Sequence, residues 1–307
     1  MIYKKLIVIL LYINYMYAIN IGTISIKNDD NLISMSKDIQ KILKKYKINS
    51  KIQIENNSLD SIEKLINNKT NNYFAIVNYD SILEYNNKKS KKYGRSIYRN
   101  IPVILTLGSE QLHIFTNENN EFEFDIKKEY SVYCGKKDSD SCISAKYIEK
   151  VYGFIFTYKK SNIKEIQSDL QNNKIELFIS VKKAPYKGFL NFKNIKLVDL
   201  PTNFKMEDIY LNSQLKTDTY TFLDEDMHIY GVNRVLITNI KDKKYDALIK
   251  NMVKIIMLNK NYLDKNNKII WEDVDFMYFR YKKFSKVSKN TIIKIDNKIR
   301  HKNALKF

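Results

Sequence analysis

Strand-like and helix-like patterns alternate three times between residues 19 and 85 of this chain. The predicted strands are 19–24, 48–54 and 73–77, and the predicted helices are 32–46, 59–66 and one that begins at Asp80. Strands that alternate with helices in this way are expected to lie parallel, because each helix carries the chain back to the start of the next strand. The pattern therefore predicts a doubly wound α/β sheet.

The alternation resumes in the second half of the chain. The predicted strands there are 101–107, 112–116, 130–134, 153–156, 175–179 and 231–238, and the predicted helices end near residues 152, 170 and 258. Ser141 or Ser144 is expected to cap the first of these helices. A chain of 307 residues can form one large or two modest domains, and no segment rich in Pro, Gly or Ser separates the halves. We expect two α/β halves of about 100 residues each that meet across a cleft.

The positive charge is a weak guide to the partners of this protein. The formal net charge is +19, but it is spread along the chain, and Lys, Asn, Ile and Tyr are abundant together. This mixture is typical of A/T-rich coding, which raises the lysine content without selection for a polyanion. Short runs such as 88–92 are interpreted as solvated loop. No nucleic-acid partner is expected. The hydrophobic content of 44% excludes a disordered chain.

The first 18 residues have the pattern of a secretory signal peptide. Lys4 and Lys5 precede an apolar run at 6–13, and the small residue Ala18 follows where a peptidase would cut. The apolar run is shorter than the roughly 20 residues of a membrane-spanning helix. Cleavage after Ala18 and a periplasmic location are therefore predicted. A buried strand or an uncleaved anchor is the alternative.

Export would place the two cysteines in an oxidising compartment. Cys134 and Cys142 enclose a short loop, and a disulfide between them would fix that loop if their Cα atoms come within about 7 Å. Two free, buried thiols are the alternative.

No set of residues predicts an enzyme. The histidines His113, His228 and His301 are isolated from one another and from the cysteines, so no metal or other cofactor is expected. No nucleophile-elbow, phosphate-loop or paired-carboxylate pattern occurs. A binding protein is the better prediction.

Several segments, in order from about Ile19 to Phe284, resemble the TAXI family, the extracytoplasmic solute-binding proteins of TRAP transporters. The segments that carry the resemblance are 19–23, 62–65, 73–80, 108–113, 132–135 with 138–141, 173–178, 219–220 and 224–226. The resemblance implies a two-lobed type II periplasmic-binding-protein fold, built as two doubly wound sheets with a cleft between them. It also implies a monomer that delivers a small carboxylate or amino acid to a TRAP-type membrane permease.

The resemblance also suggests boundaries and ligand contacts. Lobe one is expected to comprise 19–112 and 227–285, lobe two 113–226, and a basic C-terminal tail 286–307, which is either disordered or in contact with an anionic membrane surface. The ligand-binding residues implied are Thr23, Ser25, Asn78, Ser139, Ser141, Thr219 and Tyr220. Ser139 and Ser141 lie where a helix N-terminus would favour a carboxylate, although they could simply cap the helix. Asp138 and Asp140 oppose anion binding there.

The chain departs from the family in its first loop. The family has a loop rich in glycine after the first strand, whereas residues 23–30 here contain no glycine, so side chains would occupy that space. The family's late His-Pro-Gly-Ala segment is absent around Trp271. The alternative function is therefore a periplasmic sensor or interaction protein on the same fold, with altered or lost ligand binding.

Overall fold

The computed structural model describes residues 18–67, 72–93, 101–240, 242–278 and 284–304. Residues 1–17 of the predicted signal peptide lie outside this range. No helix in the described part of the chain combines the length and the apolar character needed to cross a bilayer.

The strands are β1 (Ile19–Lys27), β2 (Ile48–Glu55), β3 (Asn72–Asn78), β4 (Val103–Asn117), β5 (Glu129–Tyr133), β6 (Ile155–Tyr158), β7 (Leu177–Lys182), β8 (Ile195–Leu197), β9 (Leu211–Leu215) and β10 (Met227–Thr238). The α-helices are α2 (Asp30–Lys45), α3 (Ser58–Asn67), α4 (Tyr79–Tyr93), α5 (Asp140–Tyr152), α6 (Ile166–Gln171), α7 (Phe204–Glu207), α8 (Asp246–Leu258), α9 (Lys260–Asn266), α10 (Lys268–Trp271) and α11 (Lys286–Ala304). Short 3₁₀ turns lie at Lys187–Phe189, Thr217–Thr219 and Lys243–Tyr245.

The strands form one continuous sheet in the order β2-β1-β3-β10-β4-β7-β5-β6, with β8 on β4 and β9 on β10. The parallel strands expected from the alternating pattern are present at both ends: β1 pairs with β2 and β3, and β5 pairs with β6 and β7. Between them, β10 lies antiparallel to β3 and β4, and β4 lies antiparallel to β7. The sequence predicted two separate sheets, whereas the structure has one sheet in which β10 and β4 join the two parallel ends.

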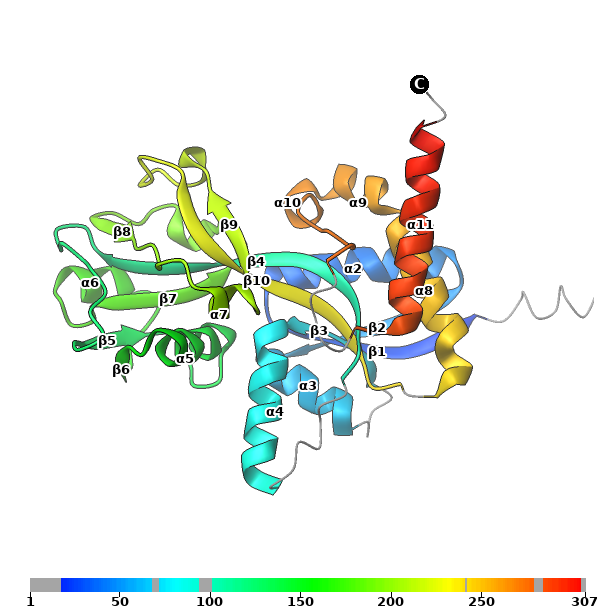
Figure 1. Ribbon diagram of the computed structural model, residues 1–307, viewed down its shortest axis with the longest axis horizontal. Coiled ribbons are helices and arrows are strands. Elements are labelled where there is room, and N and C mark those ends of the chain that lie inside the picture. The colour runs from blue at the N-terminus through cyan, green and yellow to red at the C-terminus, as the bar shows by residue number, and fades with distance from the viewer. Residues whose placement is uncertain (1–17, 68–71, 94–100, 241, 279–283, 305–307) are drawn as a thin grey trace, which may run out of the picture.

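Two lobes share this sheet (Figure 1). In lobe one, α2, α8 and α11 cover one face of β1, β3, β4 and β10, and α3 and α4 cover the other. In lobe two, apolar clusters lie around α5 and α7 on one side and around α6 and β8 on the other. Strands β4 and β10 run from one lobe into the other and are the only described segments of the sheet that connect them.

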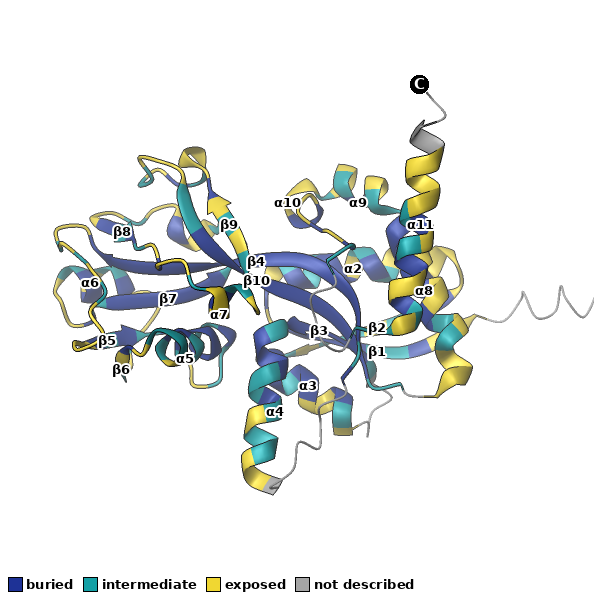
Figure 2. Cartoon of the chain, in the orientation of Figure 1, coloured by how far each residue is buried: buried dark blue, intermediate teal, exposed yellow. Residues whose placement is uncertain are grey.

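The two strands predicted at 101–107 and 112–116 are in fact one strand, β4, and all 15 of its residues are buried (Figure 2). The break was predicted because Gly108, Ser109 and Glu110 interrupt the apolar pattern. Gly108 has a φ of +75°, which a glycine adopts without strain, and the pairing register with β10 shifts there. The strand therefore bends between the lobes and does not end.

Residues 286–304 form helix α11 and not the separate tail that the sequence suggested. Ile292 and Ile295 of α11 are buried in the core of lobe one, and the helix packs against α8. The apolar periodicity of α11 is weak because only a narrow stripe of its side chains reaches this core.

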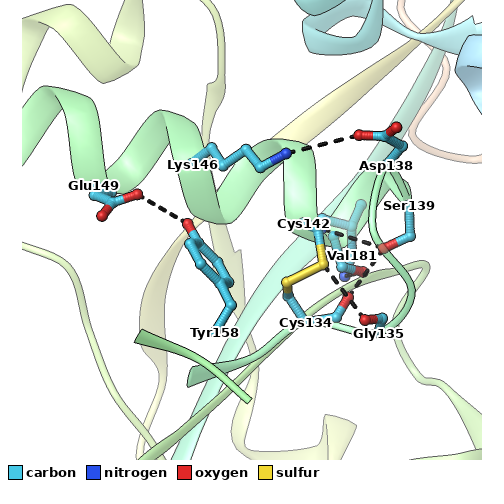
Figure 3. Close-up of a disulfide and its surroundings, with 10 residues drawn as sticks. Cys134, Gly135, Asp138, Ser139, Cys142, Lys146, Glu149, Tyr158 and Val181 are labelled. Carbon is cyan, nitrogen blue, oxygen red and sulfur yellow. Dashed lines mark hydrogen bonds and ion pairs between the residues drawn. A yellow bond between two sulfur atoms is a disulfide. The ribbon is translucent and has the colours of Figure 1, made fainter. Parts of the chain in front are cut away.

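Cys134 and Cys142 form a disulfide, with a distance of 4.8 Å between their Cα atoms (Figure 3). Of the two alternatives left open by the sequence, the bridge is the correct one. It joins the end of β5 to the first turn of α5 and so fixes the loop that precedes this helix.

Candidate functional site

Charged and polar side chains from both lobes converge where the lobes face each other. Lys27 and Asn78 lie at the carboxyl ends of β1 and β3, and Asp29 caps the N-terminus of α2. Asp140 is the first residue of α5, in lobe two. Carboxyl ends of parallel strands and the following helix N-termini meet at one edge of an α/β sheet, which is where such folds bind ligands.

Lys27 is the centre of a buried ion-pair network. Its Nζ lies 2.5 Å from Glu110 Oε2 and 2.8 Å from Asp140 Oδ2. Burial alone would lower the pKa of Lys27, but the carboxylates of Asp140 and Glu110 outweigh it and raise the pKa. Lys27 is therefore charged at any physiological pH, and it holds a carboxylate of lobe two against lobe one.

Lobe one surrounds the Asp140 carboxylate with donors. The Ser58 amide and hydroxyl, at the N-terminus of α3, donate to Asp140 Oδ1 and Oδ2 at 3.2 and 3.0 Å. The Ser81 hydroxyl donates to Oδ1 at 3.5 Å. A cation, a helix N-terminus and hydroxyl groups are the donors that proteins use to bind a carboxylate. Asp140 therefore fills a carboxylate-binding position of lobe one.

Three further ion pairs connect the lobes, and one of them, between Lys88 and Asp138, lies at the surface. Lys182 Nζ, at the end of β7, lies 2.9 Å from Asp29 Oδ2. Although burial would raise the pKa of Asp29, the charges of Lys27 and Lys182 hold it far below its usual range. Lys183 Nζ lies 2.7 Å from Asp273 Oδ2, and burial lowers the pKa of Lys183 despite this partner.

Asp80, in the first turn of α4, adds hydrogen bonds between the lobes. Its Oδ2 accepts hydrogen bonds from the Ser144 hydroxyl at 2.6 Å and from the Tyr210 hydroxyl at 3.0 Å. Burial raises the pKa of Asp80 to about 6, since the hydrogen bonds from Ser144 and Tyr210 compensate only in part. This carboxyl group therefore titrates closer to neutral pH than an ordinary aspartate does.

We expect Asp80→Asn to change how stability depends on pH. The pKa of Asp80 rises from 3.8 when unfolded to about 6 when folded, so its favourable contribution is complete below the lower value and is lost as the pH rises through 6. Relative to the Asn variant, the wild type should lose about 2 kcal/mol of unfolding free energy between about pH 4.5 and 7.5. Urea unfolding at several pH values measures this difference. Asp30→Asn, at an exposed position, is the control and should follow the wild type.

Four of the residues predicted to bind ligand lie at or beside this interface. Asn78 donates from Nδ2 to Glu110 Oε2 at 3.0 Å, and Ser25 is buried two residues before Lys27 on β1. Ser139 caps α5 and accepts from the Cys142 amide, which corrects the prediction that Ser141 or Ser144 is the cap. Ser141 accepts a hydrogen bond from the Val181 amide. Both serines thus have structural partners in this closed arrangement.

The other three predicted residues lie elsewhere. Thr23 is in the middle of β1, paired with Lys51 and Asn72, four residues before the charged end of the strand. Thr219 ends a 3₁₀ turn in lobe two. The Tyr220 hydroxyl lies 3.0 Å from His113 Nε2 inside an aromatic cluster, where burial lowers the pKa of His113 to about 4. The structure therefore does not bring Thr23, Thr219 or Tyr220 to the interface.

Sequence reasoning missed most of the charged residues that meet here. The missed residues are Lys27, Asp29, Ser58, Asp80, Glu110, Lys182, Lys183, Arg234 and Asp273. A usable signal existed for Lys27 and Asp29, because each follows directly on an apolar strand pattern, where parallel strands end at the ligand-binding edge.

The loop before α5 lines a separate cavity. Lys136 and Lys137 of this loop line a cavity of about 910 Å³ on lobe two together with Tyr133 and Tyr158. Figure 3 shows Tyr158 donating to Glu149 and Lys146 approaching Asp138 beside the disulfide. Among the described residues, no group of His, Cys, Asp and Glu could hold a metal ion.

No family model matches the sequence. No curated protein matches it significantly either. Among solved structures, the chain is similar to YhfZ from Shigella flexneri, with 13% identity, a TM-score of 0.51, and coverage of 88% of this chain and 97% of that one. It is also similar to a Candida albicans gene product whose family shows the generic periplasmic-binding-protein fold (13% identity, TM-score 0.48, 88% and 79% covered).

A third similar structure is the periplasmic aliphatic sulphonate binding protein of Escherichia coli (11% identity, TM-score 0.49, 82% and 74% covered). At these identities the similarity concerns the fold alone. The two lobes and the strands that they share (Figure 1) confirm the two-lobed α/β fold expected from the sequence. Membership of the TAXI family stays a prediction.

Proposed function

We propose that this protein is an exported receptor that captures a small organic acid or amino acid between its two lobes. The main support is the set of charged side chains that both lobes contribute to their buried interface, centred on Lys27, Glu110 and Asp140. Burying charge costs several kcal/mol unless it is paired. These side chains pair with one another when the lobes meet, and on opening they would be free to pair with a charged solute instead.

The connection between the lobes also supports a receptor. Strands β4 and β10 are the two described segments of the sheet that pass from one lobe to the other, and β4 bends at Gly108. A hinge of two strands allows the lobes to open and close around a solute. Opening would separate the ion pairs between the lobes and expose the donors of lobe one.

Export, oligomeric state and delivery are parts of the same proposal. The signal peptide is cleaved after Ala18, and the mature chain works in the periplasm as a monomer without a cofactor. It passes its solute, a carboxylate, to a TRAP-type membrane permease. This protein is a binding protein and not an enzyme, and it has no nucleic-acid partner. A gene for such a permease beside the gene for this chain would support delivery.

A thermal-shift screen of the mature chain from Ile19 tests the proposal. The panel contains mono- and dicarboxylates and the common amino acids. A solute present at about 100 times its dissociation constant should add roughly 2.7 kcal/mol to the unfolding free energy, and isothermal titration calorimetry should confirm a single site. A cooperative melt that no compound shifts would contradict the receptor function.

One observation favours a second function, a periplasmic sensor or interaction protein with altered or lost ligand binding. Asp140 already occupies the carboxylate-binding position of lobe one, and Asp29 and Asp273 already pair across the interface. A protein that closes on its own side chains would not need a solute. Small-angle scattering separates the two functions, because a receptor should become more compact with solute and a permanently closed protein should not.

A further inference from the structure

Arg234 on β10 carries a buried charge that the protein does not satisfy. The residue is completely buried, and none of Nε, Nη1 and Nη2 has a hydrogen-bond partner in the described part of the chain. A guanidinium group has five N–H donors, and burying donors without acceptors is strongly unfavourable. A ligand that supplies acceptors would complete the bonding of this guanidinium group.

Two unpaired acceptors lie on the same face of the sheet as Arg234. Asn78 is its direct cross-strand neighbour on β3, and Glu110 faces Val232, which is two residues away from Arg234 along β10. Side chains alternate along a strand, so all three residues point to one side. The Asn78–Glu110 hydrogen bond of 3.0 Å spans β10. Asn78 Oδ1 and Glu110 Oε1 have no partner among the described residues.

The absence of a side chain at Gly108 makes room for the guanidinium. A Cβ at this position would lie 3.3 Å from Arg234 Nη2 and 2.8 Å from Asp273 Oδ1. Lys183 pairs with Asp273 close by. Burial lowers the pKa of Lys183 most, and the positive charge of Arg234 lowers it further, whereas Asp273 acts in the opposite direction. Two cations therefore face one carboxylate, which leaves an excess of positive charge.

The neighbouring group of charges has the opposite excess. Lys27 pairs with the carboxylates of Glu110 and Asp140, and Lys182 pairs with that of Asp29, so two cations stand against three carboxylates. Because Glu110 accepts hydrogen bonds only at Oε2, its second oxygen is directed to no protein donor in the described chain. A positive end and a negative end thus lie side by side at the hinge.

We propose that this place binds a zwitterion, a small molecule that carries both a carboxylate and an ammonium group. Its carboxylate pairs with the guanidinium of Arg234, and its ammonium group donates to Glu110 Oε1 and Asn78 Oδ1. The proposal rests on the receptor function above and narrows the solute from organic acids in general to amino acids. The ion pairs between the lobes then close over the bound molecule.

Matched sets of compounds test this inference by calorimetry. Each set contains an L-amino acid, the carboxylic acid without the amino group and the amine without the carboxylate, for example alanine, propionate and ethylamine. Since each end makes charge-assisted bonds, removing either end should weaken binding at least about tenfold. Carboxylic acids that bind as tightly as their amino acids would overturn the inference but leave the receptor function standing. A panel in which nothing binds would overturn both.

The Arg234→Met variant adds a readout that does not depend on knowing the solute. It should no longer bind the amino acid, yet without solute it should melt at the same temperature as the wild type or higher, because an unpaired buried charge has been removed. A structural arginine would give the reverse, with a lower melting temperature and unchanged binding, and that result would overturn the inference. The control is Asn233→Leu, since the Asn233 amide is equally buried and also lacks a partner in the described part of the chain, but points to the opposite face. This variant should bind the solute as the wild type does.

Discussion

Replacing Asp140 with alanine should lower the unfolding free energy by about 3–5 kcal/mol. The change removes the carboxylate that pairs with Lys27 at 2.8 Å and accepts from Ser58, and both partners stay buried in lobe one. A buried ammonium group that loses one partner is costly, even though Glu110 still pairs with it. Urea unfolding at neutral pH measures the loss. Small-angle scattering should show a larger radius of gyration, because one of the ion pairs that close the lobes is gone.

The neighbouring Asp138 provides the matched control. Asp138 also joins the lobes, through its ion pair with Lys88, but this pair lies at the surface, where the Lys88 side chain is 38% exposed. Asp138→Ala should therefore cost no more than about 1 kcal/mol. A double-mutant cycle with Lys27→Met measures the direct coupling between Lys27 and Asp140, which should exceed about 1 kcal/mol. If Asp140→Ala and Asp138→Ala had equal effects, Asp140 would not hold the lobes together.

The alternating pattern predicted much of lobe one because its elements are local. Helix α2 buries one face against the core and strand β3 buries both, so the apolar pattern within 7 to 16 residues is enough to identify them. Strand β4 was split in two because it crosses between the lobes, and its polar centre at Ser109 and Glu110 serves the interface. A pattern read within one segment contains no information on a contact that another lobe supplies.

The candidate site was predicted less well for the same reason. Lys27 meets Glu110 across 83 positions of sequence, and Ser58 meets Asp140 across 82. The sequence places an acidic residue at the start of α5 but does not show which cation neutralises it, so Asp140 looked unfavourable for a carboxylate site. In the folded chain the same residue is itself the bound carboxylate.

Replacing Trp271 with alanine should also cost about 3–5 kcal/mol. Trp271 ends α10 and is completely buried in the core of lobe one, where its Nε1 donates to Asp38 Oδ2 on α2 at 3.0 Å. The loss of a large buried side chain leaves a cavity, and Asp38 loses a donor. Because Trp271 is the only tryptophan of the chain, unfolding must be followed by far-UV circular dichroism and not by tryptophan fluorescence.

The Trp271→Phe variant separates packing from the hydrogen bond. It keeps most of the buried ring but lacks the donor, so it should cost about 1–2 kcal/mol, well below the alanine variant. Trp271 also positions Asp273, two residues further on, against Lys183 of lobe two. The alanine variant should therefore weaken solute binding as well as stability, whereas the phenylalanine variant should retain binding. Equal losses of stability in both variants would mean that the bond to Asp38, and not the packed ring, holds this end of α10 against lobe two.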